Sequence, residues 1–141
     1  MKIAQIAPPW LPLPPKTYGG TENVLSTLVE AQVAQGHDVV LFAPGDARTS
    51  AQHVSFFPQS LVRDGVPWAM HLKAFYHLQK AMEALQEYDF DIVHTHLSSP
   101  ADLYLLPLTA SLKLPHVTNL HSHFPFDNAS GGWVGDAERY Y

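Results

Sequence analysis

The protein has 141 residues, of which 46% are hydrophobic and 15% charged, values typical of a globular domain rather than a disordered or fibrous chain. Eight basic residues against thirteen acidic ones give a formal net charge of −5, which argues against nucleic acid as a partner. The absence of cysteine excludes disulfides, thiol catalysis and thiolate metal sites. No apolar run approaches the roughly 20 residues of a membrane-spanning helix, and no signal peptide is recognisable, so we expect a cytoplasmic protein without a transmembrane segment.

The first elements predicted along the chain form a β-α-β unit. Residues 2–7 are a short apolar run typical of a strand, and a proline-rich loop joins them to a helix that Thr21 caps and Gly36 ends. The side of this helix predicted to face the sheet consists of residues at helical spacing, namely Val24, Leu25, Leu28 and Ala31. Residues 38–43 are a continuous apolar run that predicts a buried strand. Because a helix joins the two strands, we expect them to be parallel.

The second half of the chain continues this alternation. A weaker strand is predicted at residues 54–57, a buried strand at residues 91–96 and a last strand at residues 116–120. Between the first two of these lies a helix with an apolar stripe formed by Leu72, Phe75, Leu78, Met82 and Leu85. Ser99–Pro100 predicts the start of a further helix, which Pro107 shortens or kinks.

The order of these elements predicts an α/β fold, a Rossmann-like open parallel sheet with helices on both faces, in one domain over residues 1–141. No internal repeat or low-complexity linker interrupts it. Residues 136–141 resemble the start of a helix that nothing follows. We therefore expect the domain to be truncated at its C-terminal end.

Ligands bind beyond the carboxyl ends of the strands in such sheets, and the first loop there is residues 16–22. In this loop Gly19 and Gly20 bring backbone N–H groups to a helix N-terminus, which suits a phosphate group, although a simple turn also explains a glycine pair. Lys16 is positioned to approach an anionic ligand. The G-x-G-x-x-G and G-x-x-x-x-G-K-[ST] motifs are absent, which argues against nicotinamide cofactors and P-loop hydrolysis.

Two histidine pairs, His94 with His96 and His121 with His123, lie at the ends of predicted strands. Alternate strand residues share a face, so each pair can present two imidazoles together, as in a metal-dependent hydrolase, but few carboxylates lie nearby to complete a metal site. A hydrogen-bonded structural role is predicted for His94. The favoured functional residue is His121, because it follows a strand directly and its ring N–H can reach a sugar hydroxyl or an oxygen that gains charge.

Five segments, taken in order, resemble the N-terminal domain of glycosyltransferase family 4 enzymes, which have the two-domain GT-B fold and transfer sugar from a nucleotide-sugar with retention of configuration. The resemblance covers nearly the whole chain. The segments are Lys2-Ile3-Ala4, Tyr18-Gly19-Gly20-Thr21-Glu22, Gly36-His37-Asp38-Val39, Asp91-Ile92-Val93-His94-Thr95-His96 and Leu120-His121.

The resemblance implies a role for each matched site residue. Gly19 and Gly20 would approach the donor diphosphate, and His121 would contact the transferred sugar as the catalytic residue. Loops that include Lys16 and His96 would face the acceptor, a carbohydrate, lipid or small molecule. No metal or other cofactor is implied beyond the nucleotide-sugar co-substrate.

The same resemblance implies a C-terminal domain that binds the donor and is absent from this sequence, so the chain alone is expected to be inactive. The alternative is a non-catalytic binding or interaction domain that has kept a Rossmann-like scaffold, because a fold alone does not determine a function.

Overall fold

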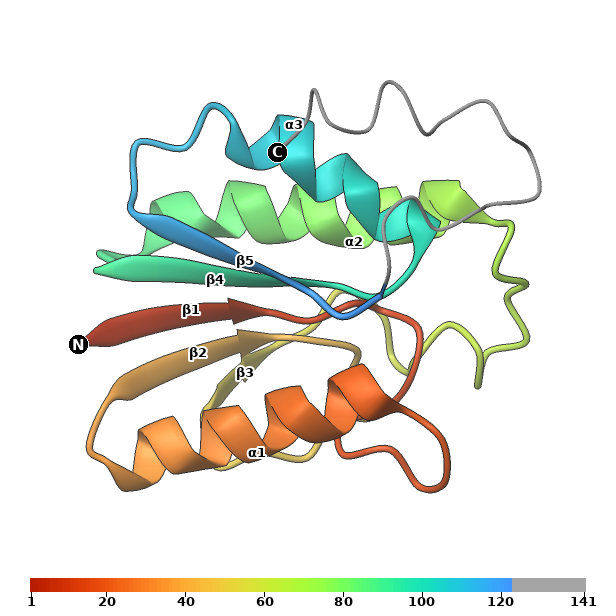
Figure 1. Ribbon diagram of the computed structural model, residues 1–141, viewed down its shortest axis with the longest axis horizontal. Helices are drawn as coiled ribbons and strands as arrows, with labels where there is room; N and C mark the ends of the chain where they lie inside the picture. Colours follow the sequence, from red (N-terminus) through yellow and green to blue (C-terminus); the bar gives the residue numbers. More distant parts are fainter. Residues whose placement is uncertain (123–141) are drawn as a thin grey trace.

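The computed structural model describes residues 1–122 and has a parallel β-sheet between two layers of helices (Figure 1). Its strands are β1 Lys2–Ile6, β2 Asp38–Phe42, β3 Gln52–Val54, β4 Ile92–Leu97 and β5 His116–Leu120. They lie in the order β3-β2-β1-β4-β5, and every neighbouring pair is parallel. This confirms the predicted Rossmann-like α/β fold of the kind found in the N-terminal half of GT-B proteins.

The helices lie on both faces of the sheet, as predicted. Helix α1 Gly20–Ala34 covers one face, while α2 His71–Ala84 and α3 Leu105–Thr109 cover the other (Figure 1). Two 3₁₀ turns, η1 Leu85–Glu87 and η2 Pro100–Tyr104, continue α2 and precede α3. Because the strand order reverses between β1 and β4, a crevice is expected at the carboxyl ends of these two strands, and this is where ligands bind in open α/β sheets.

Both faces of the sheet are apolar, because both are covered. On the α1 face, Ile3 of β1 packs with Leu25 and other buried residues of one cluster. On the α2 face, Ile6 of β1 packs with Leu78 and Leu85 in another. The alternation of side chains along β1 thus supplies both halves of the core.

The face of α1 that packs on the sheet differs from the prediction. Val24 is 52% exposed and Ala31 is also exposed, whereas Leu25 and Val29 are fully buried. Residues 25 and 29 have the spacing of one helix face, and residues 24, 28 and 31 have the spacing of another. Local periodicity therefore permits two rotations of the helix about its axis, and packing against the sheet selects one of them.

Two predicted boundaries also need correction. Thr21 lies inside α1, and Gly19 occupies the cap position with a φ of 146° and no side-chain hydrogen bond. The weaker strand is Gln52–Val54 rather than residues 54–57. Its register explains this difference, since Val54 lies opposite Phe42, the last residue of β2, and no ladder partner extends beyond it.

The other predicted elements are confirmed to within a residue or two. Strands β1, β2, β4 and β5 lie at the predicted positions, and β5 has no buried residue. Pro100 starts η2, and α3 ends two residues after Pro107, so the predicted helix is short. In α2 the predicted stripe holds for Leu78 and Met82, but Leu72 is 76% exposed. His123 and the helix predicted at residues 136–141 lie outside the described residues.

Candidate functional site

Four polar side chains lie together on the α1 face of the sheet, near its carboxyl edge. Gln5 of β1 is fully buried, and the strand register places it beside His94 of β4. His96 lies two residues further along β4 and is also fully buried. His121 directly follows β5, where its backbone N–H donates to the carbonyl of Leu97 at 2.9 Å. We call Gln5, His94, His96 and His121 the Gln5–histidine cluster.

Hydrogen bonds join the cluster into one chain. The Nε2 amide of Gln5 donates to Gln32 Oε1 of α1 at 2.9 Å and lies 3.3 Å from His94 Nδ1. His96 contributes both ring nitrogens, because its Nε2 lies 2.9 Å from Gln5 Oε1 and its Nδ1 lies 2.9 Å from His121 Nε2. The rings of His96 and His121 are stacked, with centroids 5.2 Å apart.

The histidines of this cluster are uncharged at neutral pH. Burial and, to a smaller extent, the neighbouring His94 and His121 lower the pKa of His96 to about 3. Burial also lowers the pKa of His94 and of His121. The cluster therefore has no positive charge with which to hold a phosphate, and its ring nitrogens offer only hydrogen bonds.

The geometry separates the two histidines that the resemblance placed next to substrates. His121 is partly exposed at the carboxyl edge, where a ligand can reach it. His96 is fully buried and both of its ring nitrogens already have protein partners, so it is poorly placed for the predicted contact with an acceptor. The side chain of His96 instead links Gln5 to His121.

Gly19 and Gly20 begin α1 at the same end of the molecule as the carboxyl ends of β1 and β4 (Figure 1). A Cβ atom added to Gly19 would lie 2.7 Å from Pro15 Cβ and 2.9 Å from Glu22 Oε2, and its φ of 146° also favours glycine. A Cβ added to Gly20 would meet no heavy atom within 4 Å. The fold thus explains Gly19, whereas Gly20 leaves open space beside the backbone of the helix N-terminus.

Two buried carboxyl groups lie behind this loop. Glu22, in the first turn of α1, is 3% exposed, and its pKa is raised by burial and, to a smaller extent, by the charge of Asp102. Asp102 accepts hydrogen bonds from the backbone and hydroxyl groups of Ser98 and Ser99, at 2.8 to 3.1 Å, and from Trp10 Nε1 at 3.3 Å. Burial raises the pKa of Asp102 and these bonds oppose the rise. Asp102 fixes the connection after β4 to the loop after β1.

Lys16 lies apart from the histidines, in a cavity of about 210 Å³ beside the proline-rich loop. The basic side chains of Arg48 and Arg63 also line this cavity. Its acidic member, Asp46, accepts hydrogen bonds from Ser60 and lies 3.5 Å from Arg63. The hydrogen bonds found within residues 1–122 connect His96 with His121 and join neither of them to Lys16.

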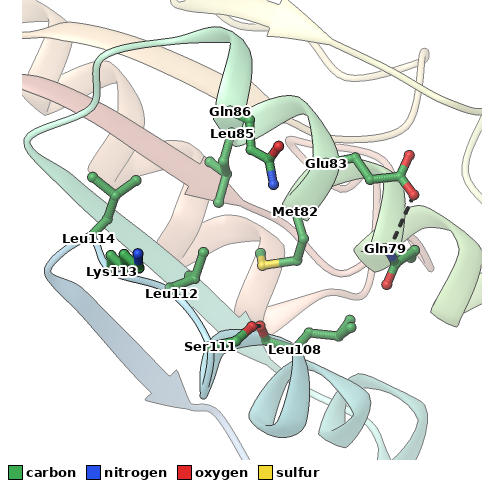
Figure 2. A pocket seen from close by; sticks show the side chains of 10 residues that line it. All are labelled: Gln79, Met82, Glu83, Leu85, Gln86, Leu108, Ser111, Leu112, Lys113 and Leu114. Carbon is green, nitrogen blue, oxygen red and sulfur yellow. Dashed lines mark hydrogen bonds between the residues drawn. The ribbon is translucent and has the colours of Figure 1, made fainter.

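A cavity of about 440 Å³ lies at the opposite end of the sheet, before the start of β5 (Figure 2). Met82 and Leu85 face Leu112 and Leu114 across it. Its walls are mainly aliphatic, and it lies away from the carboxyl edge at which open parallel sheets bind ligands. The Gln5–histidine cluster and the loop before α1 are therefore the better candidates for a functional site.

Within residues 1–122, no group of three or more histidine, cysteine, aspartate or glutamate side chains is arranged to hold a metal ion. No helix in the same part of the chain is long and apolar enough to cross a membrane.

Gln5 was not among the predicted site residues, although the sequence contains a signal for it. Gln5 is the only amide side chain in the apolar run of residues 2–7, and a polar group in a buried strand needs a hydrogen-bond partner. Its partners His94 and His96 lie about 90 residues away, and only the pairing of β1 with β4 identifies them. Trp10, in the loop after β1, is also fully buried and donates to Asp102.

The fold and this edge define an α/β domain of the Rossmann-like class with polar groups at its ligand-binding end. The sequence matches Glycosyltransferase Family 4 over residues 18–141, and the chain belongs to this family. It is therefore a glycosyltransferase-type domain, a class whose substrates are sugar compounds. No curated protein matches the sequence significantly.

Proposed function

We propose that this chain is the acceptor-side domain of a nucleotide-sugar-dependent glycosyltransferase with the two-domain GT-B architecture. A C-terminal domain binds the nucleotide, and a hexose passes to a hydroxyl group of a carbohydrate, lipid or small molecule with retention of configuration. Gly19 and Gly20 approach the donor diphosphate, and His121 contacts the transferred sugar. Lys16 faces the acceptor. The reaction uses no metal ion or other cofactor, and the enzyme is cytoplasmic.

One observation carries this proposal: residues within the family match gather at the ligand-binding edge of the sheet. Gly20 lies at the start of a 15-residue helix with open space beside its backbone. His121 follows β5 at the carboxyl edge and is held by His96 at 2.9 Å. A diphosphate next to α1 and a sugar next to His121 would both lie at the strand ends, as ligands of open α/β sheets do.

In the proposed reaction, the acceptor oxygen bonds to the anomeric carbon on the face from which the nucleoside diphosphate departs. The bond between that carbon and the diphosphate oxygen breaks, and the hydroxyl proton passes to the departing phosphate. Negative charge then grows on the phosphate, where the N–H groups and dipole of α1 stabilise it.

The test is turnover of UDP-, GDP- and ADP-sugars, measured for the 141-residue chain and for the protein extended through the coding sequence that follows Tyr141. We expect turnover in the extended protein and none in the chain alone. If neither form hydrolyses or transfers any of these sugars, the proposal is wrong and a non-catalytic binding domain becomes the better description.

His121→Ala in the active form provides the matched test of the site. Loss of one ligand contact is expected to lower kcat/KM by about tenfold or more. His116→Ala, at the exposed start of the same strand, should leave turnover unchanged. Equal losses for the two variants would show that His121 is not part of the site.

A further inference from the structure

The direction of each hydrogen bond in the Gln5–histidine cluster follows from the chemistry of its partners. Gln32 Oε1 is an acceptor, and it lies 2.9 Å from the Gln5 side chain, so the amide nitrogen of Gln5 must face it. The amide oxygen of Gln5 consequently faces His96 Nε2 at 2.9 Å. An amide oxygen only accepts, and therefore Nε2 of His96 carries a proton.

The state of His96 determines that of His121. A neutral imidazole has one N–H group and one bare nitrogen, so protonated Nε2 leaves Nδ1 of His96 as an acceptor. His121 Nε2 lies 2.9 Å from this Nδ1 and must donate to it. In neutral His121 the remaining nitrogen, Nδ1, is then an acceptor, and within the described residues it takes part in no hydrogen bond.

We propose that Gln5 is a positioning residue that fixes the hydrogen bonds of His96 and His121, so that His121 presents its bare Nδ1 to a sugar hydroxyl. The proposal reverses the expectation from sequence that His121 offers a ring N–H to the ligand. It relies on the proposed function only for the nature of the ligand. No covalent bond changes in this chain of side chains, and no proton leaves it.

Burial of the Gln5–histidine cluster favours one direction for its hydrogen bonds. Gln5 and His96 are both fully buried, and a buried N–H group that loses its acceptor costs more than a normal hydrogen bond contributes. To reverse the direction of these hydrogen bonds, the side-chain amides of Gln5 and Gln32 would both have to rotate. A proton would also have to move from one ring nitrogen to the other in His96 and in His121. The low pKa of His96 and His121, which burial causes, keeps both rings neutral, so that each has one donor and one acceptor.

The test is the tautomeric state of the histidines in the 141-residue chain, read from the ¹⁵N chemical shifts of the imidazole rings at pH 7. We expect pyrrole-type Nε2 and pyridine-type Nδ1 in both His96 and His121. A pyrrole-type Nδ1 in either ring would overturn the proposal, and this measurement needs no variant and no turnover.

Two substitutions separate positioning from simple support of the fold. Gln5→Glu keeps an acceptor for His96 Nε2 but removes the donor to Gln32 Oε1, and a proton should remain on His96 Nε2. Gln5→Met removes the acceptor, so His96 should move its proton to Nδ1, donate to His121 and convert the Nδ1 of His121 into a donor. Gln52→Met makes the same replacement at an exposed position of β3 and should change neither ring.

In a form that turns over nucleotide-sugars, Gln5→Met should lower kcat/KM by about tenfold, while Gln52→Met should retain it. Unchanged tautomers in folded Gln5→Met would contradict the proposal. If the tautomers are as expected and no variant turns over sugar, the proposed function fails and the positioning by Gln5 stands. If Gln5→Met does not fold, the wild-type tautomers alone decide.

Discussion

Two neighbouring glycines at the start of α1 differ in their surroundings. Gly19 is enclosed by Pro15 and Glu22 and has a φ of 146°, whereas Gly20 has open space where a side chain would project. In the sequence both positions are simply glycine, and nothing there distinguishes them. Their environments assign the backbone conformation to Gly19 and leave Gly20 as the position where a ligand can approach the helix.

The two glycines provide a matched pair of variants. Gly19→Ala should reduce the free energy of unfolding by about 2 kcal/mol, because alanine is strained at this φ. Gly20→Ala should leave it unchanged or raise it by about 0.5 kcal/mol, since the unfolded chain loses freedom. If Gly20 lies beside a diphosphate, Gly20→Ala should nevertheless weaken nucleotide-sugar binding by about tenfold. Chemical unfolding and calorimetric titration of the active form check the two parts, and undiminished binding by Gly20→Ala would remove Gly20 from the site.

The individual site residues were only partly predictable from sequence. Its position directly after a predicted strand favoured His121, and the family resemblance implied a role for His96; the structure brings their ring nitrogens to within 2.9 Å. Their different exposure was not visible in the pattern, and neither was Gln5, which connects them to α1. These features depend on which strands are neighbours, and a local sequence pattern has no information on that.

At the scale of elements, the connection from β4 to η2 depends on one carboxylate. Asp102 Oδ2 accepts four hydrogen bonds from Ser98 and Ser99, and Oδ1 accepts one from Trp10. Ser99 and Asp102 form a capping box at the start of η2. Because Trp10 belongs to the loop after β1, the same side chain joins the loops that follow the two central strands.

Asp102→Ala should reduce the free energy of unfolding by about 3 kcal/mol, because several buried donors lose their acceptor at once. Asp102→Asn keeps one acceptor oxygen and should fall between this variant and the wild type. Asp89→Ala removes an exposed carboxylate and should change stability by less than about 0.5 kcal/mol. Urea unfolding measures all three, and similar values for Asp102→Ala and Asp89→Ala would refute the structural role.

The positions of the elements were more predictable than their orientations. Strand β2 follows a continuous apolar run closed by Pro44 and Gly45, a pattern that marks a buried strand clearly, whereas β5 has no buried residue. Helix α1 has apolar residues on two sides, so Val24 was predicted to be buried and is exposed. Strand β3 is three residues long, and its bounds depend on the length of β2 beside it rather than on its own composition.

At the scale of the whole molecule, two fully buried histidines link folding to pH. His77 of α2 donates through Nε2 to the carbonyl of Ala7 at 3.0 Å, and Phe56 and Phe57 lie against its ring. Burial lowers the pKa of His77 to about 4, and the pKa of His96 is lowered to about 3. Both rings are neutral in the folded chain and take up a proton more readily when it unfolds.

The stability contributed by these neutral rings is present above their unfolded pKa of about 6.5 and is lost as the pH falls toward the folded values. When the pH falls from 7 to 5, each of the two histidines should reduce the free energy of unfolding by about 2 kcal/mol. His77→Gln retains a donor for Ala7 and should reduce the total loss by about 2 kcal/mol.

Urea unfolding at pH 7 and pH 5 measures the loss for the wild type and for His77→Gln. His116→Gln, at the exposed start of β5, should lose as much unfolding free energy as the wild type. The linkage to His77 would be wrong if His77→Gln lost as much stability as the wild type over this pH range.

The order of the strands also determines how the chain assembles. Strand β1 pairs with β2 across a short segment, Lys2 with Asp38, but with β4 only across a long one, Gln5 with His94. The entropy cost of closing a segment rises with its length, so we expect the β1-α1-β2 unit to form first. During synthesis, one edge of β1 then has no partner until β4 has left the ribosome, and an unpaired edge favours aggregation. The pairing of β1 with β4 therefore completes the centre of the sheet late, and chains arrested before β4 should be the ones that chaperones capture.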